Sequence, residues 1–156
     1  MRVVIMSGVS GSGKSTYARK LWNELEPGTY CKVVSADDYF MVNGEYEFDS
    51  SKLSAAHSKC FRDYLAALQD DYSLVIVDNT NLTSEEISPY MLAASAFGYE
   101  AEVITLTGKM LSETVVMLSD RNLHGVSPNN VMYQHSKLLS RKLPPWWKET
   151  TIPIET

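Results

Sequence analysis

Residues 8–15 read Gly-Val-Ser-Gly-Ser-Gly-Lys-Ser. It matches the pattern G-x-x-x-x-G-K-[S/T] at every fixed position. An apolar run rich in β-branched residues, residues 2–7, precedes it, and a segment with helical character begins at Lys14. A buried strand, a glycine-rich turn and a helix in this order predict a loop whose backbone N–H groups surround phosphate oxygens.

The side chains of this loop supply the charge and the metal ligand that a triphosphate requires. Lys14 is expected to contact the β- and γ-phosphates, the Ser15 hydroxyl to ligate Mg²⁺, and Thr16 to support them. A chance match in a glycine-rich turn is the alternative, and the flanking strand and helix argue against it. We therefore expect ATP or another NTP with Mg²⁺. The predicted nucleotide-binding residues are Gly8, Ser10, Gly11, Ser12, Gly13, Lys14, Ser15 and Thr16.

Composition restricts the class of protein. With 156 residues, 44% hydrophobic and 21% charged, the chain has the size and makeup of one globular domain. A net charge of −5 argues against non-specific binding along a duplex, although it leaves room for a small basic site that holds one strand end. The two cysteines are far apart and show no metal-ligand spacing. Together with the lack of a long apolar run, they predict no membrane association and a cytoplasmic protein, in the host cytoplasm if phage-encoded.

Strand and helix patterns alternate along the chain, which predicts a parallel sheet covered on both faces. Residues 39–49 contain an Asn43-Gly44 turn and predict a loop or small hairpin. Thr83 with Glu86 predicts a capping box, and Ser127 followed by Pro128 predicts a helix start. Expected strands are residues 2–7, 32–35, 74–78 and 101–106, and expected helices are about 14–24, 51–69, 84–97, 111–122 and 128–142.

These elements predict a three-layer α/β P-loop domain over residues 1–142. The expected sheet is small and parallel, with its four strands, numbered as they occur in the sequence, in the order 2-3-1-4. A helical lid is expected at about residues 110–130. Pro144-Pro145 ends the last helix, so the tail at 143–156 is expected to be irregular.

Acidic residues follow two of the expected strands. Asp37 and Asp38 come directly after the second strand, and Asp78 ends the third. Ligands of open parallel sheets lie at the carboxyl ends of the strands. One carboxylate of the Asp37/Asp38 pair can accept the proton of an attacking hydroxyl. Asp78 has the position of a carboxylate that holds Mg²⁺, often through water. The alternative for each is an ordinary turn or capping residue.

Three segments then resemble a known family when taken together. They are residues 35–39 (Ser-Ala-Asp-Asp-Tyr), 78–82 (Asp-Asn-Thr-Asn-Leu) and 121–126 (Arg-Asn-Leu-His-Gly-Val). In this order they resemble the polynucleotide 5′-hydroxyl kinase family of the P-loop kinase superfamily, which has AAA-domain and zeta-toxin-like relatives. The resemblance covers roughly residues 1–140. It implies a P-loop kinase fold and ATP-dependent transfer of the γ-phosphate to the 5′-hydroxyl end of RNA or DNA, in nucleic acid repair.

The resemblance also implies roles for individual residues. It makes Asp37 the general base and Arg121 the lid arginine that reaches over the β- and γ-phosphates, so that with Lys14 they form the catalytic set. It makes Asp38 a structural or metal-side helper. The residues expected to bind substrate are Asp38, Tyr39, Asn79, Thr80 and Asn81.

One departure from the family pattern concerns the acceptor. Phage enzymes of the family carry an arginine shortly after the acidic pair, where this chain reads Tyr39-Phe40-Met41. Tyr39 and Phe40 could stack on a base instead. The missing arginine and the acidic pI of about 5.2 favour a first alternative, a kinase of a small-molecule hydroxyl such as a nucleoside, sugar or other metabolite. A nucleotide-binding interaction module is the second alternative.

A few side chains stay open at this point. His57 either lines the acceptor pocket or is an ordinary helical histidine. Arg141 and Lys142 either contact nucleotide or cap their helix, and the cap is favoured. Trp146-Trp147 is compatible with core, adenine platform or interface, and the oligomeric state is not predicted.

Overall fold

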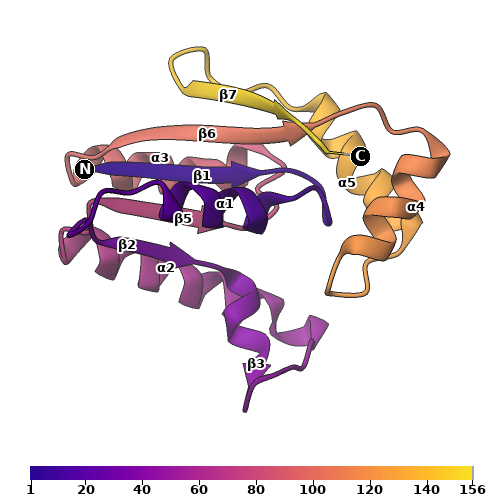
Figure 1. Ribbon diagram of the computed structural model, residues 1–156, viewed down its shortest axis with the longest axis horizontal. Coiled ribbons are helices and arrows are strands. Elements are labelled where there is room, and N and C mark those ends of the chain that lie inside the picture. The colour runs from indigo at the N-terminus through magenta and orange to yellow at the C-terminus, as the bar shows by residue number, and fades with distance from the viewer. Residues whose placement is uncertain (156) are drawn as a thin grey trace.

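A five-stranded parallel sheet forms the centre of the computed structural model, which describes residues 1–155. Its strand order is β2-β5-β1-β6-β7 (Figure 1). Val3, Val4 and Ile5 of the central strand are fully buried, because both faces of the sheet are covered. The strands are β1 (Arg2–Ser7), β2 (Cys31–Val34), β5 (Leu74–Asp78), β6 (Glu100–Thr107) and β7 (Lys148–Pro153).

Helices complete the three layers. Alternate residues of β1 face different helices, so that Val3 and Ile5 pack with α2 and α3, while Val4 and Met6 pack with α1 and with parts of α4 and α5. The pair α4 and α5 lies beyond the carboxyl ends of the strands (Figure 1). The helices are α1 (Lys14–Asn23), α2 (Leu53–Gln69), α3 (Ser84–Ala96), α4 (Ser112–Arg121) and α5 (Pro128–Ser140).

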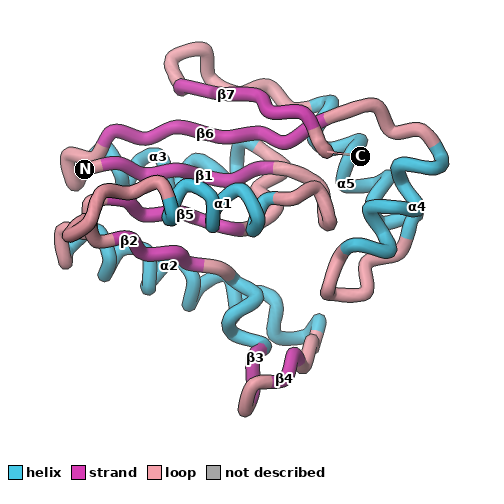
Figure 2. Tube along the Cα trace, viewed as in Figure 1, coloured by secondary structure: helices cyan, strands magenta, loops and turns pink. Residues whose placement is uncertain are grey.

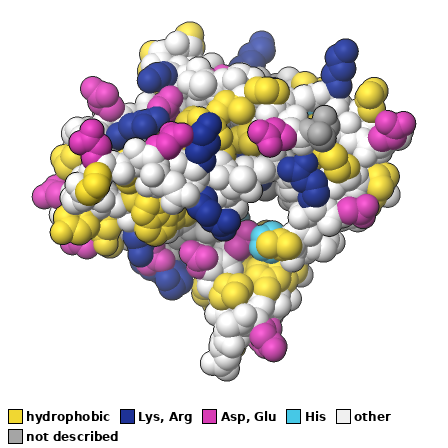
Figure 3. Space-filling model, viewed as in Figure 1, with side chains coloured by type: hydrophobic (Ala, Val, Ile, Leu, Met, Phe, Trp, Pro, Cys, Tyr) yellow, Lys and Arg dark blue, Asp and Glu magenta, His cyan; other side chains and the backbone are white. Residues whose placement is uncertain are grey.

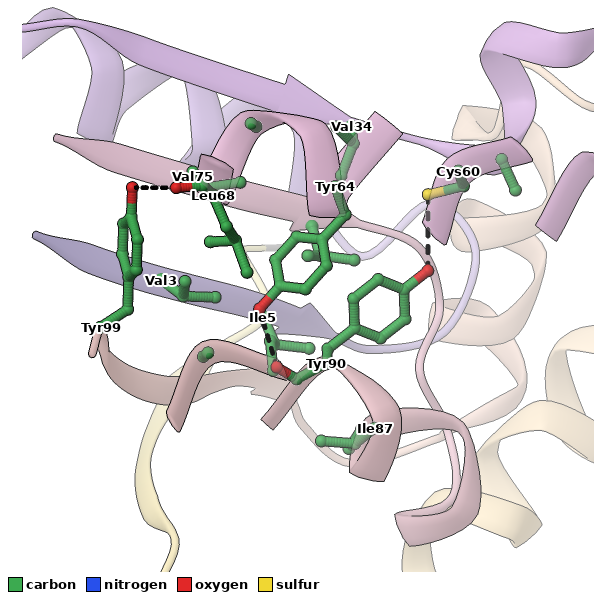
Figure 4. Close-up of a cluster of buried hydrophobic side chains, with 14 of the residues drawn as sticks. Val3, Ile5, Val34, Cys60, Tyr64, Leu68, Val75, Ile87, Tyr90 and Tyr99 are labelled. Atoms are coloured by element: carbon green, nitrogen blue, oxygen red, sulfur yellow. Dashed lines mark hydrogen bonds between the residues drawn. The ribbon is translucent and has the colours of Figure 1, made fainter. Parts of the chain in front are cut away.

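The core between the sheet and helices α2 and α3 contains tyrosines whose hydroxyl groups are all hydrogen-bonded. Tyr64 donates to the carbonyl oxygen of Tyr90 at 2.7 Å, and the Tyr90 hydroxyl lies 3.5 Å from Cys60 Sγ (Figure 4). The Tyr99 hydroxyl donates to the Tyr72 carbonyl oxygen at 2.8 Å. Hydrogen bonds of this kind offset the cost of burying the hydroxyl group of a large aromatic side chain.

The predicted fold class and the order of the four predicted strands are confirmed, with boundaries that shift by one or two residues. The prediction of an irregular tail is wrong, since Lys148–Pro153 is strand β7 and pairs in parallel with β6. Most of its side chains are exposed, as befits an edge strand, so the Lys-Glu-Thr-Thr segment lacks the apolar alternation by which a strand is recognised.

The segment after β2 holds a short 3₁₀ helix, η1 (Ala36–Phe40), and a hairpin of β3 (Met41–Val42) and β4 (Glu45–Tyr46), set apart from the main sheet in Figure 2. Asn43 and Gly44 at its tip have φ angles of 51° and 83°, as the predicted turn requires. The predicted stacking of Phe40 on a base is wrong, because its ring is 2% exposed and packs within the core.

A second 3₁₀ turn, η2 (Ser50–Lys52), leads into α2. Within residues 1–155, no helix combines the length and the apolar character needed to cross a membrane.

Candidate active site

The glycine-rich loop lies between β1 and α1 and is held by neighbours on two sides. The Gly8 N–H donates to the Thr80 carbonyl oxygen at 2.9 Å, and the Ser10 N–H donates to Gln134 Oε1 of α5 at 2.8 Å. Gly11 has a φ of 78°, and a Cβ added there would lie 2.2 Å from the Leu118 carbonyl oxygen. The loop therefore requires glycine both for its backbone angle and for its close approach to α4.

Lys14 and Ser15 open helix α1 at the carboxyl edge of the sheet. Lys14 Nζ donates to the Val9 carbonyl oxygen at 3.0 Å, and Ser15 Oγ lies 2.7 Å from Asp78 Oδ2. Burial lowers the pKa of Lys14 to about 8, and the carboxylates of Asp78 and Asp37 oppose this shift. The Lys14 ammonium group thus lies close enough to the carboxylates of Asp78 and Asp37 to interact with both.

The Ser15 hydroxyl and the Asp78 carboxylate form an oxygen donor pair. Mg²⁺ prefers such ligands and commonly takes one or two from the protein, with phosphates and water supplying the others. Within residues 1–155, no group of three His, Cys, Asp or Glu side chains forms a metal site that is complete by itself. The pair therefore fits a magnesium ion bound together with nucleotide, and poorly fits a structural metal centre.

Asp37 stands at the start of η1, where its N–H donates to Ser35 Oγ at 3.2 Å. Its carboxylate has a neighbour on each oxygen: the Tyr46 hydroxyl is 3.4 Å from Oδ1, and His124 Nε2 is 3.2 Å from Oδ2. Burial, followed by the charge of Asp37, raises the pKa of Tyr46 to about 12, so its hydroxyl stays protonated and donates. Burial, Asp37 and Asp78 raise the pKa of Asp38.

A cleft of about 540 Å³ joins these groups. Figure 3 shows the hollow at the end of the sheet, with basic, acidic and histidine side chains around it. Twelve of the predicted site residues line the cleft: Ser10, Gly11, Gly13, Lys14, Ser15, Thr16, Asp37, Asp38, Asp78, Asn79, Thr80 and Arg121.

Four predicted site residues, Gly8, Ser12, Tyr39 and Asn81, lie outside that lining. The Ser12 hydroxyl is buried without a hydrogen-bond partner. Tyr39 packs edge-on against Phe40, and Asn81 Nδ2 donates to the Met6 carbonyl oxygen at 2.8 Å. The side chain of Asn81 thus supports the loops of the site, and so does that of Asn79, whose Oδ1 accepts the Ala36 N–H at 2.8 Å.

Arg121 ends helix α4 and leans toward the glycine-rich loop. Its Nη1 donates to the Glu155 carbonyl oxygen at 2.7 Å, and its Nη2 is 3.9 Å from the position of a Cβ added to Gly13. The guanidinium group is thus beside the part of the cleft where phosphates are expected. Its role as a lid arginine remains a prediction.

The structure also gives Arg141 a supporting role that the sequence did not predict. Its side chain is 6% exposed, and its guanidinium group donates to Ser7 Oγ at 2.6 Å and to Thr105 Oγ1 at 2.9 Å. It also pairs with Glu149 of β7 at 3.4 Å. Arg141 does occupy the C-cap position of α5, but its side chain turns into the sheet and joins β1, β6 and β7.

The remaining open residues lie away from the cleft. His57 is exposed on α2 and does not line the cleft. Trp147 packs against the core, while Trp146 is 80% exposed. The sequence did not predict the site contacts of Tyr46, His124 and Gln134, because these contacts depend on how distant segments come together.

Comparison with known proteins assigns the chain to a family. The profile of a family described as an AAA domain matches residues 3–109. The chain belongs to this AAA-domain family. Human NEDD4-binding protein 2 is 33% identical over 135 residues, which is 85% of this AAA-domain chain and 7% of that protein. Mouse 2′,3′-cyclic-nucleotide 3′-phosphodiesterase is 29% identical over 100 residues, which is 64% of the chain and 22% of that protein. The chain therefore spans a small part of these relatives.

Solved structures share the fold of the AAA-domain chain. The RNA repair complex Pnkp1/Rnl/Hen1 contains a chain that matches with a TM-score of 0.68 and 18% identity, over 88% of this chain and 44% of that one. Chaetomium thermophilum Kti12 in complex with ADP-AlF3 matches with a TM-score of 0.63 and 16% identity, over 97% and 87%. The APS kinase CysC of Mycobacterium tuberculosis, with AMPPNP and APS, gives 0.54 and 16%, over 99% and 89%. The fold is that of P-loop kinases.

Proposed function

We propose that this AAA domain is an ATP-dependent kinase that transfers the γ-phosphate to the 5′-hydroxyl end of RNA or DNA. One observation carries the proposal: the Asp37 carboxylate lines the same cleft as Lys14 and the Ser15–Asp78 pair. Phosphotransfer to a hydroxyl needs a proton acceptor on one side and neutralised phosphate charge on the other. The family resemblance of the three sequence segments, and the RNA repair complex among the proteins of similar fold, support a nucleic-acid end as the acceptor.

The reaction that these residues would catalyse is a single displacement. The acceptor hydroxyl oxygen forms a bond to the γ-phosphorus while the bond from that phosphorus to the β,γ-bridging oxygen breaks, and ADP leaves. Asp37 takes the hydroxyl proton and later loses it to solvent. Lys14 and Arg121 offset the phosphate charge as it moves onto the bridging oxygen. Mg²⁺ held by Ser15 and Asp78 would neutralise further phosphate charge when bound.

A kinase of a small-molecule hydroxyl is the second candidate, and the distribution of charge in the cleft favours it. Among the described residues, the basic side chains that line the cleft are Lys14 and Arg121, both beside the phosphate loop. The acceptor end instead presents Asp37 and Asp38. An uncharged nucleoside or sugar would meet no repulsion there. The Asp37 carboxylate opposite Lys14 argues against the other candidate, an interaction module without transfer.

Transfer of radiolabelled γ-phosphate from ATP tests these alternatives directly. RNA and DNA oligonucleotides with a 5′-hydroxyl are offered beside free nucleosides and sugars. We expect the oligonucleotides to be labelled, and Asp37→Ala to lower kcat by about 10²–10⁴-fold, the usual worth of a general base. Asp63→Ala, an exposed carboxylate on α2 that pairs with Lys59, is the matched control and should match the wild type.

Each contrary outcome has its own meaning. Labelling confined to nucleosides or sugars would replace the proposed acceptor with a small molecule. Nucleotide binding without transfer to any acceptor would indicate the interaction module. Near-normal transfer by Asp37→Ala would remove Asp37 from the role of base.

A further inference from the structure

The general-base candidate Asp37 is contacted by the loop that follows α4. His124 Nε2 of this loop is 3.2 Å from Asp37 Oδ2, and the His124 ring lies 4.5 Å, centroid to centroid, from the ring of Tyr46. Tyr46 itself donates to Oδ1 of the same carboxylate. The Tyr46 hydroxyl and the His124 imidazole, from separate segments of the chain, therefore contact the two oxygens of one carboxylate.

The position of His124 is set by an internal network around Asn122. The Asn122 Nδ2 group donates to the carbonyl oxygens of Ser119 at 2.7 Å and Val126 at 3.1 Å. Its Oδ1 accepts the backbone N–H groups of His124 at 3.2 Å and Val126 at 2.8 Å. Ser119 Oγ adds a bond to the Val126 carbonyl oxygen at 2.7 Å. One side chain thus folds residues 122–126 into a fixed turn on the end of α4.

The same turn begins at Arg121, whose guanidinium group lies against Gly13 of the phosphate loop. Arg121 and His124 both line the cleft, the first beside the phosphate loop and the second against Asp37. Asn122 holds the backbone between them. The same loop therefore positions the Arg121 guanidinium group beside the phosphate loop and the His124 imidazole beside Asp37.

We propose that His124 is a positioning residue for Asp37, which it orients toward the acceptor hydroxyl when the loop after α4 lies over the phosphate loop. The inference rests on the proposed function and deepens it. The contact between His124 Nε2 and Oδ2 would hold the carboxylate in place, and the hydroxyl proton passes to Asp37 as the oxygen–phosphorus bond forms. The two side chains are 37% and 48% exposed, and exposed pairs of this kind contribute little to stability. Loss of the contact should therefore appear in the rate.

Steady-state kinetics on a 5′-hydroxyl oligonucleotide test the inference with a pair of amides of different length. His124→Ala and His124→Asn should lower kcat by about ten- to a hundredfold, since small misplacements of a catalytic group cost this much. The KM for ATP should stay within about twofold, because the donor contacts are untouched. His124→Gln should recover most of kcat, since its Nε2–H₂ group reaches as far as the imidazole Nε2. His57→Ala, an exposed histidine of α2 outside the cleft, is the control.

A double substitution asks whether His124 acts through Asp37. In the Asp37→Ala background, His124→Ala should produce no further loss of kcat. Wild-type kcat in His124→Ala, failure of His124→Gln to exceed His124→Asn, or a full additional loss in the double variant would each overturn the positioning role alone. A wild-type protein that labels no acceptor would overturn the proposed function, and the positioning role with it.

Discussion

Lys14 is subject to opposing influences at the scale of one residue. Burial lowers its pKa to about 8, while Asp78 and Asp37 favour its charged form. Below this pKa the ammonium group can pair with phosphate, and above it the charge is lost. The affinity for ADP should therefore fall as the pH rises from about 8 to 9.5, by at most about tenfold per pH unit for one linked proton. Titration calorimetry at several pH values measures this, and proton uptake on binding should appear in the same range.

Lys14→Met provides the control for that titration. It should bind ADP weakly and without a fall in affinity over the same pH range, because no ammonium group is left to lose its proton. A wild-type affinity that stays level between pH 7 and 9.5 would show that Lys14 keeps its charge, and would contradict the pKa.

Individual residues also show how far sequence reasoning reaches into the site. The proximity of Ser15 and Asp78 follows from the fold class, since both stand at the carboxyl edge of adjacent parallel strands, and their oxygens are indeed 2.7 Å apart. The contact of His124 with Asp37 could not be predicted, because it depends on how a loop beyond α4 sits over η1. Local patterns carry periodicity and turn chemistry, but they do not encode the placement of one loop on another.

Among the elements, the junction of the phosphate loop with α4 is the most sensitive to a single methyl group. Gly11→Ala would place a Cβ 2.2 Å from the Leu118 carbonyl oxygen, in a backbone conformation with φ of 78°. Gly28→Ala imposes a similar angle, 88°, with nothing within 4 Å. We expect Gly28→Ala to lower the free energy of unfolding by about 1 kcal/mol, and Gly11→Ala to cost more and to weaken nucleotide binding.

Thermal unfolding with and without ADP compares the two alanine variants. The difference between them isolates the clash with α4 from the backbone strain that they share. Equal melting temperatures would mean that α4 moves away from the loop at little cost, which would contradict the tight junction between them.

Strand β7 shows at the same scale where element prediction stops. Its Lys-Glu-Thr-Thr segment lacks apolar alternation, yet it pairs with β6 through the backbone and contributes Glu149 to the buried guanidinium group of Arg141. From the local sequence, a charged residue at a helix end such as Arg141 is predicted to be a cap. Only the assembled sheet reveals that its partners, Ser7 and Thr105, lie on neighbouring strands.

For the whole molecule, the net charge of −5 and its distribution determine how an acceptor strand can be bound. Proteins that bind along nucleic acid neutralise many phosphates, and their affinity then falls steeply with salt. Here the cleft offers Lys14 and Arg121 beside the phosphate loop and carboxylates at the acceptor end. An acceptor strand would therefore be gripped at its terminal nucleoside, with few contacts to the phosphates that follow.

This distribution predicts a weak dependence on salt and on strand length. The logarithm of kcat/KM for a 5′-hydroxyl oligonucleotide should fall against the logarithm of salt concentration with a slope of about −1 or shallower, as expected when about one phosphate is neutralised on a single strand. A trinucleotide and a 20-mer should have similar KM values, because the acceptor end of the cleft presents Asp37 and Asp38 to the phosphates that would follow. Kinetics from 50 to 300 mM KCl with both acceptors measure the two quantities. A steep slope, with a KM that improves as the strand lengthens, would mean that basic side chains outside the cleft hold the strand.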